Sequence, residues 1–266
     1  MESLAGLRER RASECRLTPD RALGSLDEAE GFLRERGMLT RTTDSALPSL
    51  YEACHEESYQ PGGQGFAAWP ATKWPWFGDL GGRGYLCVAV HRGKNLLTSP
   101  ETAALLDPIC RAETDRMRAA DPAWRRLLDH LAMTGPSLID DLRVELDLKR
   151  HELKALRYPL ERCGAVVARS VATASAGGAA GDDSHSYPTE LSRWDQAYPG
   201  DQAAASADPV AALGDLLAAA VQAAVVAPEA DLRRWFSWQW YLTDTLIDDV
   251  VRSGRLRRVD GYLAVA

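Results

Sequence analysis

The sequence contains few cysteines, and their positions do not suggest a metal site. Five occur among 266 residues, widely scattered and without a Cys-x-x-Cys pair: Cys15, Cys54, Cys87, Cys110 and Cys163. Such a set predicts neither a disulfide framework nor zinc ligands, which need paired or closely spaced side chains. We therefore expect reduced thiols in a cytoplasmic protein. No residue pattern indicates a metal or another cofactor.

Long apolar runs are also missing. The longest, residues 216–227, includes Gln222 and is shorter than the roughly 20 residues that span a bilayer. No N-terminal apolar run resembles a signal peptide. These features predict a soluble protein with no membrane partner.

The common catalytic motifs are absent as well. There is no nucleophile elbow, phosphate-binding loop, dinucleotide-binding glycine motif or His-Glu-x-x-His zinc motif. Residues 54–57 supply a thiol, an imidazole and two carboxylates, but adjacent residues on a helix point in different directions. The residues alone therefore identify no catalytic centre.

Net positive charge is lacking too. The formal net charge is -7, and attraction to nucleic-acid phosphates needs local positive charge. An acidic chain of this kind is not an indiscriminate nucleic-acid binder, so any DNA site must be confined to one cationic face.

The chain does contain a repeated order of predicted elements. Asp121-Pro122 combines a preferred N-cap with a preferred first helical residue. Two more helices follow, from Ser137 and from about Lys149, and then a β-branched strand, a low-complexity tip at 174–184 and a returning strand at 185–189. Three helices and a hairpin in this order are typical of a winged helix.

The same order recurs after Asp208-Pro209, with a third helix at about 240–252 and the two-residue hairpin signal Asp260-Gly261. The sequence thus predicts a mainly helical α+β protein with tandem winged-helix domains and β-hairpin wings. The predicted parts are a lead-in at 1–23 that is a frayed amphipathic helix or partly disordered, an N-terminal α+β domain with an aromatic loop region at 24–120, a winged helix with a long wing at 121–195, a linker at 196–207 and a C-terminal winged helix at 208–266.

The third helix of the first predicted winged helix is cationic. Residues 149–169 contain six Lys or Arg against two Glu, and a helix in this position enters a DNA major groove. We expect contacts to double-stranded DNA from Lys149, Arg150, Lys154, Arg157 and Arg169. The alternative is that the helix packs against protein, and that its outer face is charged only because water surrounds it.

Two further stretches offer weaker DNA-binding candidates. Residues 55–80 are rich in aromatic, Gly and Pro residues, so the rings either form a satellite core or line a pocket that stacks on a base, with Lys73 near a phosphate. The basic turn after the strand 85–90 carries Arg92 and Lys94 around a glycine. It holds a phosphate, or it is an ordinary solvated hairpin turn.

The polar stretch around Asp44 has two interpretations. Asp44 or Ser45 is well placed to cap a predicted helix at 46–54. The stretch 36–45, together with Trp235–Trp238 and the closing hairpin, also resembles the AlkZ and YcaQ group of bacterial DNA glycosylases, and more closely the shorter actinobacterial proteins labelled AlkZ-related.

This resemblance implies tandem winged helices around a DNA channel and the removal of alkylated bases. The family uses a Gln-aliphatic-Gln or Gln-aliphatic-Asp motif followed by a small hydroxyl residue, and the matching positions are Thr42, Thr43, Asp44 and Ser45. Asp44 and Ser45 fit the motif, whereas Thr42 and Thr43 stand where the family has Gln and an aliphatic residue. The catalytic positions that the resemblance implies are Asp44 and Thr42.

Three functions are compatible with the sequence. The chain is a glycosylase-related protein of DNA repair or self-resistance, a catalytically inactive DNA-binding or regulatory winged-helix protein, or a protein-interaction scaffold. The sequence does not indicate the lesion, an effector or the oligomeric state.

Overall fold

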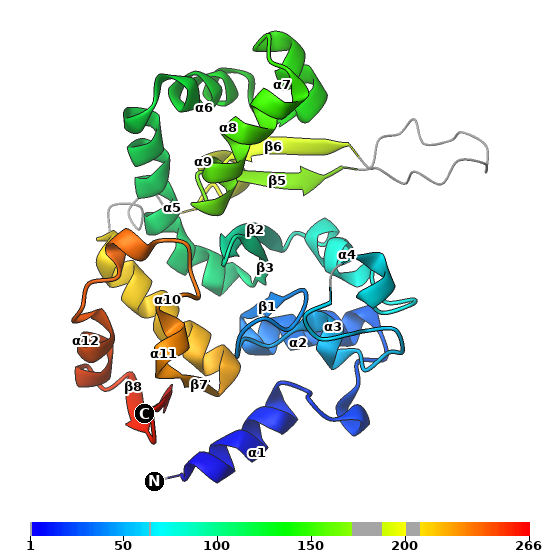
Figure 1. The fold of residues 1–266 in the computed structure, drawn as a ribbon, viewed down its shortest axis with the longest axis vertical. Coiled ribbons are helices and arrows are strands. Elements are labelled where there is room, and N and C mark those ends of the chain that lie inside the picture. The colour runs from blue at the N-terminus through cyan, green and yellow to red at the C-terminus, as the bar shows by residue number, and fades with distance from the viewer. Residues whose placement is uncertain (1, 64, 172–187, 201–207) are drawn as a thin grey trace.

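The computed structural model describes residues 2–63, 65–171, 188–200 and 208–266. Within this part of the chain, helices surround three small antiparallel sheets of three strands each (Figure 1). The protein is a mainly helical α+β structure.

The three sheets are built in the same way. Each has a short strand, then helical segments, then a hairpin, and in each sheet the short strand pairs with the second strand of the hairpin. The strand orders are β1-β3-β2, β4-β6-β5 and β7-β9-β8. We call the three parts the first, middle and third units.

The first unit repeats this order although the sequence predicted it only for the other two. Its elements are α2 (Leu26–Arg36), β1 (Met38–Thr40), α3 (Leu50–Ala53), η2 (Phe66–Ala68), α4 (Trp76–Gly82), β2 (Leu86–His91) and β3 (Lys94–Thr98). The Ser25 hydroxyl accepts a hydrogen bond from the Glu28 amide, and Gly37 ends α2 in the left-handed conformation that favours glycine.

The middle unit carries the cationic helix. It comprises α6 (Pro122–Thr134), β4 (Ser137–Leu138), α7 (Ile139–Glu145), α8 (Arg150–Arg162), β5 (Val166–Ser170), β6 (Thr189–Arg193) and α9 (Trp194–Ala197). Asp121 caps α6 through a 2.7 Å hydrogen bond to the Ala123 amide. Helix α8 continues through Pro159 to Arg162. The expected wing tip at 174–184 lies outside the described residues.

The third unit has the predicted hairpin. It comprises α10 (Pro209–Ala224), β7 (Val226–Pro228), α11 (Glu229–Leu232), η4 (Gln239–Tyr241), α12 (Leu246–Arg252), β8 (Leu256–Val259) and β9 (Tyr262–Val265). Asp260 and Gly261 both have positive φ, as a two-residue hairpin turn requires. The helix expected at 240–252 is shorter, because η4 and a turn precede α12.

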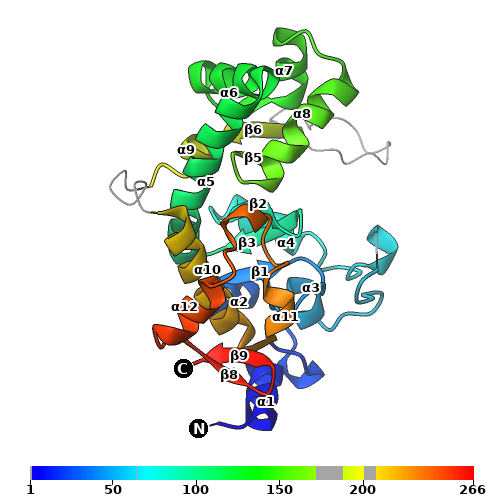
Figure 2. The same ribbon diagram turned by 60° about the vertical axis from the view of Figure 1, so that its left-hand side comes forward.

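The N-terminal segment, for which the sequence left a frayed amphipathic helix and a partly disordered lead-in open, is helical in the structure. It forms α1 and a short turn of helix: α1 (Leu4–Glu14) and η1 (Pro19–Arg21). Leu7 and Cys15 are fully buried and pack with Val225, Val226 and Ala264 of the third unit. The two chain ends therefore meet on one side of the molecule (Figures 1 and 2).

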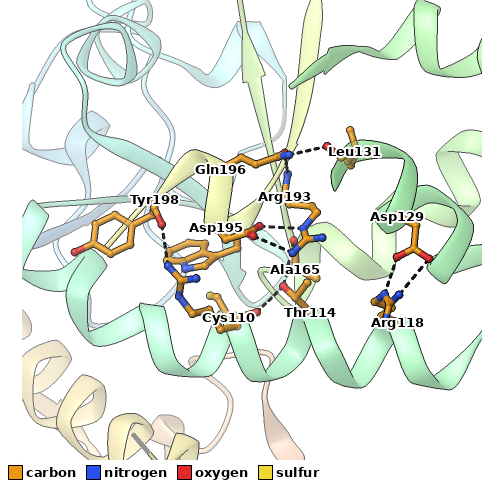
Figure 3. Close-up of polar contacts among 12 residues, drawn as sticks. Cys110, Thr114, Arg118, Asp129, Leu131, Ala165, Arg193, Asp195, Gln196 and Tyr198 are labelled. Atoms are coloured by element: carbon orange, nitrogen blue, oxygen red, sulfur yellow. Dashed lines mark hydrogen bonds and ion pairs between the residues drawn. The ribbon is translucent and has the colours of Figure 1, made fainter. Parts of the chain in front are cut away.

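The long helix α5 (Pro100–Ala120) joins the units. It packs against α6, α9, α10 and β3, and its buried residues share one cluster with buried residues from each of the three units. Figure 3 shows how polar contacts fasten α5 to the middle unit: the Thr114 hydroxyl lies 3.4 Å from the Ala165 carbonyl oxygen, and Arg118 pairs with Asp129 at 2.6 Å.

The segment 235–238 ties the third unit to the other two. Both the amide and the hydroxyl of Ser237 donate to the Val90 carbonyl of β2, at 3.0 and 3.1 Å. The buried Trp238 indole donates to the Cys163 carbonyl of the middle unit at 2.9 Å. The end of β2 is thus the point where the three units meet.

We predict that Trp238→Phe destabilises the protein, because the Cys163 carbonyl loses an indole donor in a buried environment. The free energy of unfolding should fall by about 1–3 kcal/mol. Urea unfolding measures this change, provided that the dependence of the free energy on urea concentration is the same in both proteins. Trp74→Phe, at a ring that is 39% exposed, serves as the control and should change it by less than ~0.5 kcal/mol. Equal stability of both variants would contradict the assigned role of Trp238.

Candidate functional site

Asp44 lies on a closed loop between β1 and α3. The Thr40 amide donates to the Pro48 carbonyl at 2.9 Å, and the Ser49 hydroxyl donates to the Arg41 carbonyl at 3.0 Å. These two bonds hold the base of the loop, and Asp44 stands near its centre.

Asp44 does not cap a helix. Helix α3 begins at Leu50 and is capped by Ser49, so the expected helix at 46–54 is wrong in its start. The reason is Pro48, whose ring disfavours a helical conformation at the preceding residue. Ser45 accepts a hydrogen bond from the Leu47 amide at 3.2 Å and so closes a local turn.

The Asp44 carboxylate instead pairs with the hairpin turn between β2 and β3. One oxygen lies 3.1 Å from Nε2 of His91, which is fully buried, and the other lies 2.9 Å from the Lys94 ammonium. The Asp44 carbonyl also accepts a hydrogen bond from the Arg92 guanidinium. Two stretches that are 47 residues apart in the sequence therefore form one site.

The turn geometry explains how three cationic or polar side chains reach Asp44. His91 pairs with Lys94 across the hairpin, and the two residues between them, Arg92 and Gly93, have φ values of 52° and 72°. This is a two-residue turn with both central residues at positive φ. Residues 91 and 94 face each other across it, and Asp44 lies between their side chains.

Asp44 stays ionised although it is only 12% exposed. Burial raises the pKa of the carboxyl, but hydrogen bonds from His91 and Lys94 and their charges outweigh it and hold the pKa below its usual value. The second ring nitrogen of His91, Nδ1, is buried and has no hydrogen-bond partner among the described residues.

A pocket of about 380 Å³ opens beside this carboxylate. It is lined by Thr42 and Asp44 from the loop, Lys94 from the hairpin, the Trp69 ring, Arg41 and several glycines. The Arg41 guanidinium lies over the rings of Trp69 and Phe77, with its carbon 5.0 and 4.7 Å from the ring centroids. The pocket thus combines a carboxylate, an aromatic face and a cation.

The other expected site residues are placed differently. The Lys73 ammonium donates to the carbonyls of Leu23 and Cys54 and lies near the Trp76 ring, so it is used within the first unit. Of the aromatic region, Trp69 and Phe77 pack around Tyr51, while Phe66 is 70% exposed. Both a satellite core and a pocket wall are therefore present.

The cationic residues of α8 lie on the surface of the middle unit. Lys149, Arg150 and Lys154 are exposed and have no ion pair among the described residues. Arg157 pairs with Glu161 at 3.2 Å, and Arg169 pairs with Glu190 at 2.7 Å. These five do not line the Asp44 pocket, but α8 and β2 are in contact.

Sequence reasoning placed His91 in the basic turn but not among the site residues, and it did not single out Arg41. Neither has a recognisable motif, and both contribute through partners distant in sequence. The position of His91 at a strand end, next to a Gly turn, is the signal that the sequence carries.

The sequence matches no family model and no curated protein. The fold does match a solved structure, the DNA glycosylase AlkZ of Streptomyces sahachiroi. The fold is AlkZ-like. The TM-score is 0.57 at 12% sequence identity, and the match covers 100% of this chain and 70% of AlkZ.

No helix in the described ranges is long and apolar enough to cross a membrane. In the same ranges, no group of three or more His, Cys, Asp or Glu side chains is placed to hold a metal ion. All five cysteine thiols are free.

We predict that Asp44 stabilises the fold in a pH-dependent way. Because its folded-state pKa is lowered, its contribution is present above the pKa of an unfolded Asp, about 3.9, and is lost as the pH falls further. Asp44→Asn should be less stable than the parent at pH 7, and the difference should shrink below about pH 4. Urea unfolding from pH 7 to pH 3 measures it, with Asp141→Asn on the exposed face of α7 as the control. A difference independent of pH would count against the ion pair.

Proposed function

We propose that this chain is a DNA-binding protein of the AlkZ and YcaQ group, in its shorter AlkZ-related set, and that it releases alkylated bases from duplex DNA. The observation that carries the proposal is the ionised, half-enclosed Asp44 carboxylate beside a pocket with an aromatic wall. The AlkZ-like fold supports it.

The chemistry needs only one carboxylate. An N7-alkylated purine is already a cationic leaving group, so the bond between sugar and base breaks without a general acid. A carboxylate then stabilises the positive charge that develops on the sugar and orients the attacking water. The base must first leave the stack, and the pocket that would receive it is lined by Trp69 and several glycines.

Each partner of Asp44 has a distinct part in this proposal. His91 is buried and fixes one carboxylate oxygen. Lys94 is 59% exposed, so its ammonium is free to move away from the other oxygen. The cationic sugar would take the position that Lys94 occupies in the free protein, and Lys94 would turn toward a phosphate.

The three units are, in this proposal, winged helices. The supporting observation is that each has a helix, a short strand, further helical segments and a hairpin, with the short strand paired to the second hairpin strand. In the middle unit α8 takes the position of the recognition helix. Arg150, Lys154 and Tyr158 follow one another at intervals of four residues along it, and all three are exposed.

A second candidate is DNA binding without base release. It is favoured by Thr42, which lines the pocket where the glycosylase motif has Gln, because a Thr hydroxyl is shorter than a Gln amide. The two candidates share the DNA surface and differ in whether Asp44 acts.

We predict that Asp44→Asn abolishes base release, because a neutral amide cannot stabilise the positive sugar. Duplex DNA carrying an N7-methylguanine is incubated with protein, and heat or alkali then reveals abasic sites as strand breaks. The parent should produce breaks, Asp141→Asn should match it, and Asp44→Asn should fall to the rate without protein. Duplex binding by Asp44→Asn should persist.

Two results would remove the catalytic assignment. If Asp44→Asn releases the base at the parental rate, another group acts. If the parent produces no abasic sites but binds the duplex, the second candidate is correct.

We predict that α8 binds DNA phosphates. Replacing Lys149, Arg150 and Lys154 together by Ala should lower the slope of log affinity against log salt by about 0.9 for each phosphate that the variant no longer neutralises. Arg157→Ala is the comparison and should have a smaller effect, since Arg157 already pairs with Glu161. Fluorescence anisotropy with a labelled duplex measures both, and an unchanged slope in the triple variant would show that α8 does not bind DNA.

A further inference from the structure

A second pocket also borders the hairpin turn that holds Asp44. Its volume is about 420 Å³, and its lining includes three arginines: Arg92, Arg162 and Arg234. They come from the first, middle and third units respectively. A pocket to which each unit contributes one guanidinium is unexpected in a chain of net charge -7.

Arg92 is fixed in this pocket by both its backbone and its side chain. Its φ is 52°, and its amide donates to the Trp235 carbonyl at 3.2 Å. The guanidinium donates to the Asp44 carbonyl, while its Nε atom is buried and has no partner among the described residues. Arg92 therefore connects this pocket to the Asp44 loop.

Arg162 is held against the turn by packing. It is the last residue of α8, and its guanidinium carbon lies 5.5 Å from the centroid of the Tyr158 ring. A Cβ atom added to Gly93 would lie 2.7 Å from its Nε. Glycine at position 93 thus allows the Arg162 guanidinium to lie directly over the turn. No ion pair involves Arg162 within the described ranges.

The charges of the pocket do not cancel. Arg234 is 74% exposed and lies 3.6 Å from Asp231, which is the one acidic residue in the lining. Three guanidinium groups against one carboxylate leave a formal excess of two positive charges. Several arginines lining one pocket can bind the oxygens of a phosphate with several hydrogen bonds.

We propose that this pocket binds a phosphate group of the DNA strand whose altered nucleotide enters the Asp44 pocket. Two features favour a phosphodiester of DNA over a free anion. Lys154, Tyr158 and Arg162 continue the α8 surface at intervals of four residues into this pocket, and Arg92 contacts the Asp44 loop. The identity of the ligand as DNA rests on the proposed function.

The test uses the full chain, three variants of the pocket and one control variant. Arg162→Gln and Arg234→Gln each remove one charge from the pocket, and Gly93→Ala displaces the Arg162 guanidinium without changing the charge. Arg233→Gln is the matched control, because Arg233 is the neighbour of Arg234 but contacts Asp244 and is not in the lining. Thermal unfolding of each variant establishes that it is folded.

Duplex binding is measured by anisotropy across a range of salt. Arg162→Gln should lower the salt slope by about 0.9. Arg234→Gln should lower it by less, because Arg234 already pairs with Asp231, and Arg233→Gln should leave it unchanged. A set of duplexes is also tested in which one phosphate at a time is replaced by a neutral methylphosphonate. At one position this replacement should weaken binding by the parent protein. The same replacement should weaken binding by Arg162→Gln or Gly93→Ala very little. If no linkage couples to Arg162, or if Arg233→Gln behaves like Arg234→Gln, the proposal is overturned.

A measurement with inorganic phosphate distinguishes a DNA phosphodiester from a free anion as the ligand of this pocket. We expect phosphate to stabilise the parent protein slightly more than chloride does at the same ionic strength. Arg162→Gln should lose this stabilisation. We also expect one methylphosphonate position to couple to Arg162, as described above. Phosphate stabilisation without linkage coupling would show a free-anion site and overturn the DNA assignment. Linkage coupling in a protein that produces no abasic sites would uphold this pocket while removing base release from the proposed function.

Discussion

The backbone pairing between the end of β2 and residues 235–237 is the contact on which the rest of the structure depends. The Arg92 amide bonds to the Trp235 carbonyl and the Ser237 amide bonds to the Val90 carbonyl, so His91 is enclosed between them and is fully buried against Phe236. A buried imidazole needs a partner, and Asp44 provides it. The pairing of two units thus determines where the candidate carboxylate must lie.

This arrangement explains why Asp44 is held so firmly on a loop. A loop residue normally samples several positions, but Asp44 is tied through its carbonyl and both carboxylate oxygens to residues of one hairpin turn. The hairpin itself is clamped by the third unit on one side and contacted by α8 and β5 on the other. Rigid support of this kind is what a charge-stabilising group requires, because its alignment is then in place before the substrate arrives.

Much of the local structure could be predicted from the sequence, since local signals decide it. The caps at Ser25 and Asp121 and the turn at Asp260-Gly261 form as their residue types indicate. The packing of α1 could not be predicted, because Leu7 is buried against residues more than 200 positions away. For the same reason the sequence leaves Asp44 with two interpretations, a cap and a catalytic carboxylate: its partners are on a distant hairpin, and nothing in residues 40–48 encodes them. The resemblance drew attention to Asp44, whereas only the structure brought it together with the basic turn.

The distribution of ion pairs explains how an acidic chain can present a cationic surface. In the third unit the hairpin arginines are used internally: Arg255 pairs with Asp215, and Arg258 pairs with Glu229 and Asp248. Along α8, by contrast, Lys149, Arg150, Lys154 and Arg162 have no acidic partner among the described residues. A paired arginine adds little to attraction at a distance, because its field is cancelled nearby, whereas unpaired cations on one helix add together within a Debye length of about 8–10 Å. The net charge of -7 therefore opposes polyanion binding over most of the surface, whereas unpaired cations gather along the line from Lys149 to Arg162. That line ends at the hairpin turn between β2 and β3. The residues on either side of this turn, His91 and Lys94, hold Asp44.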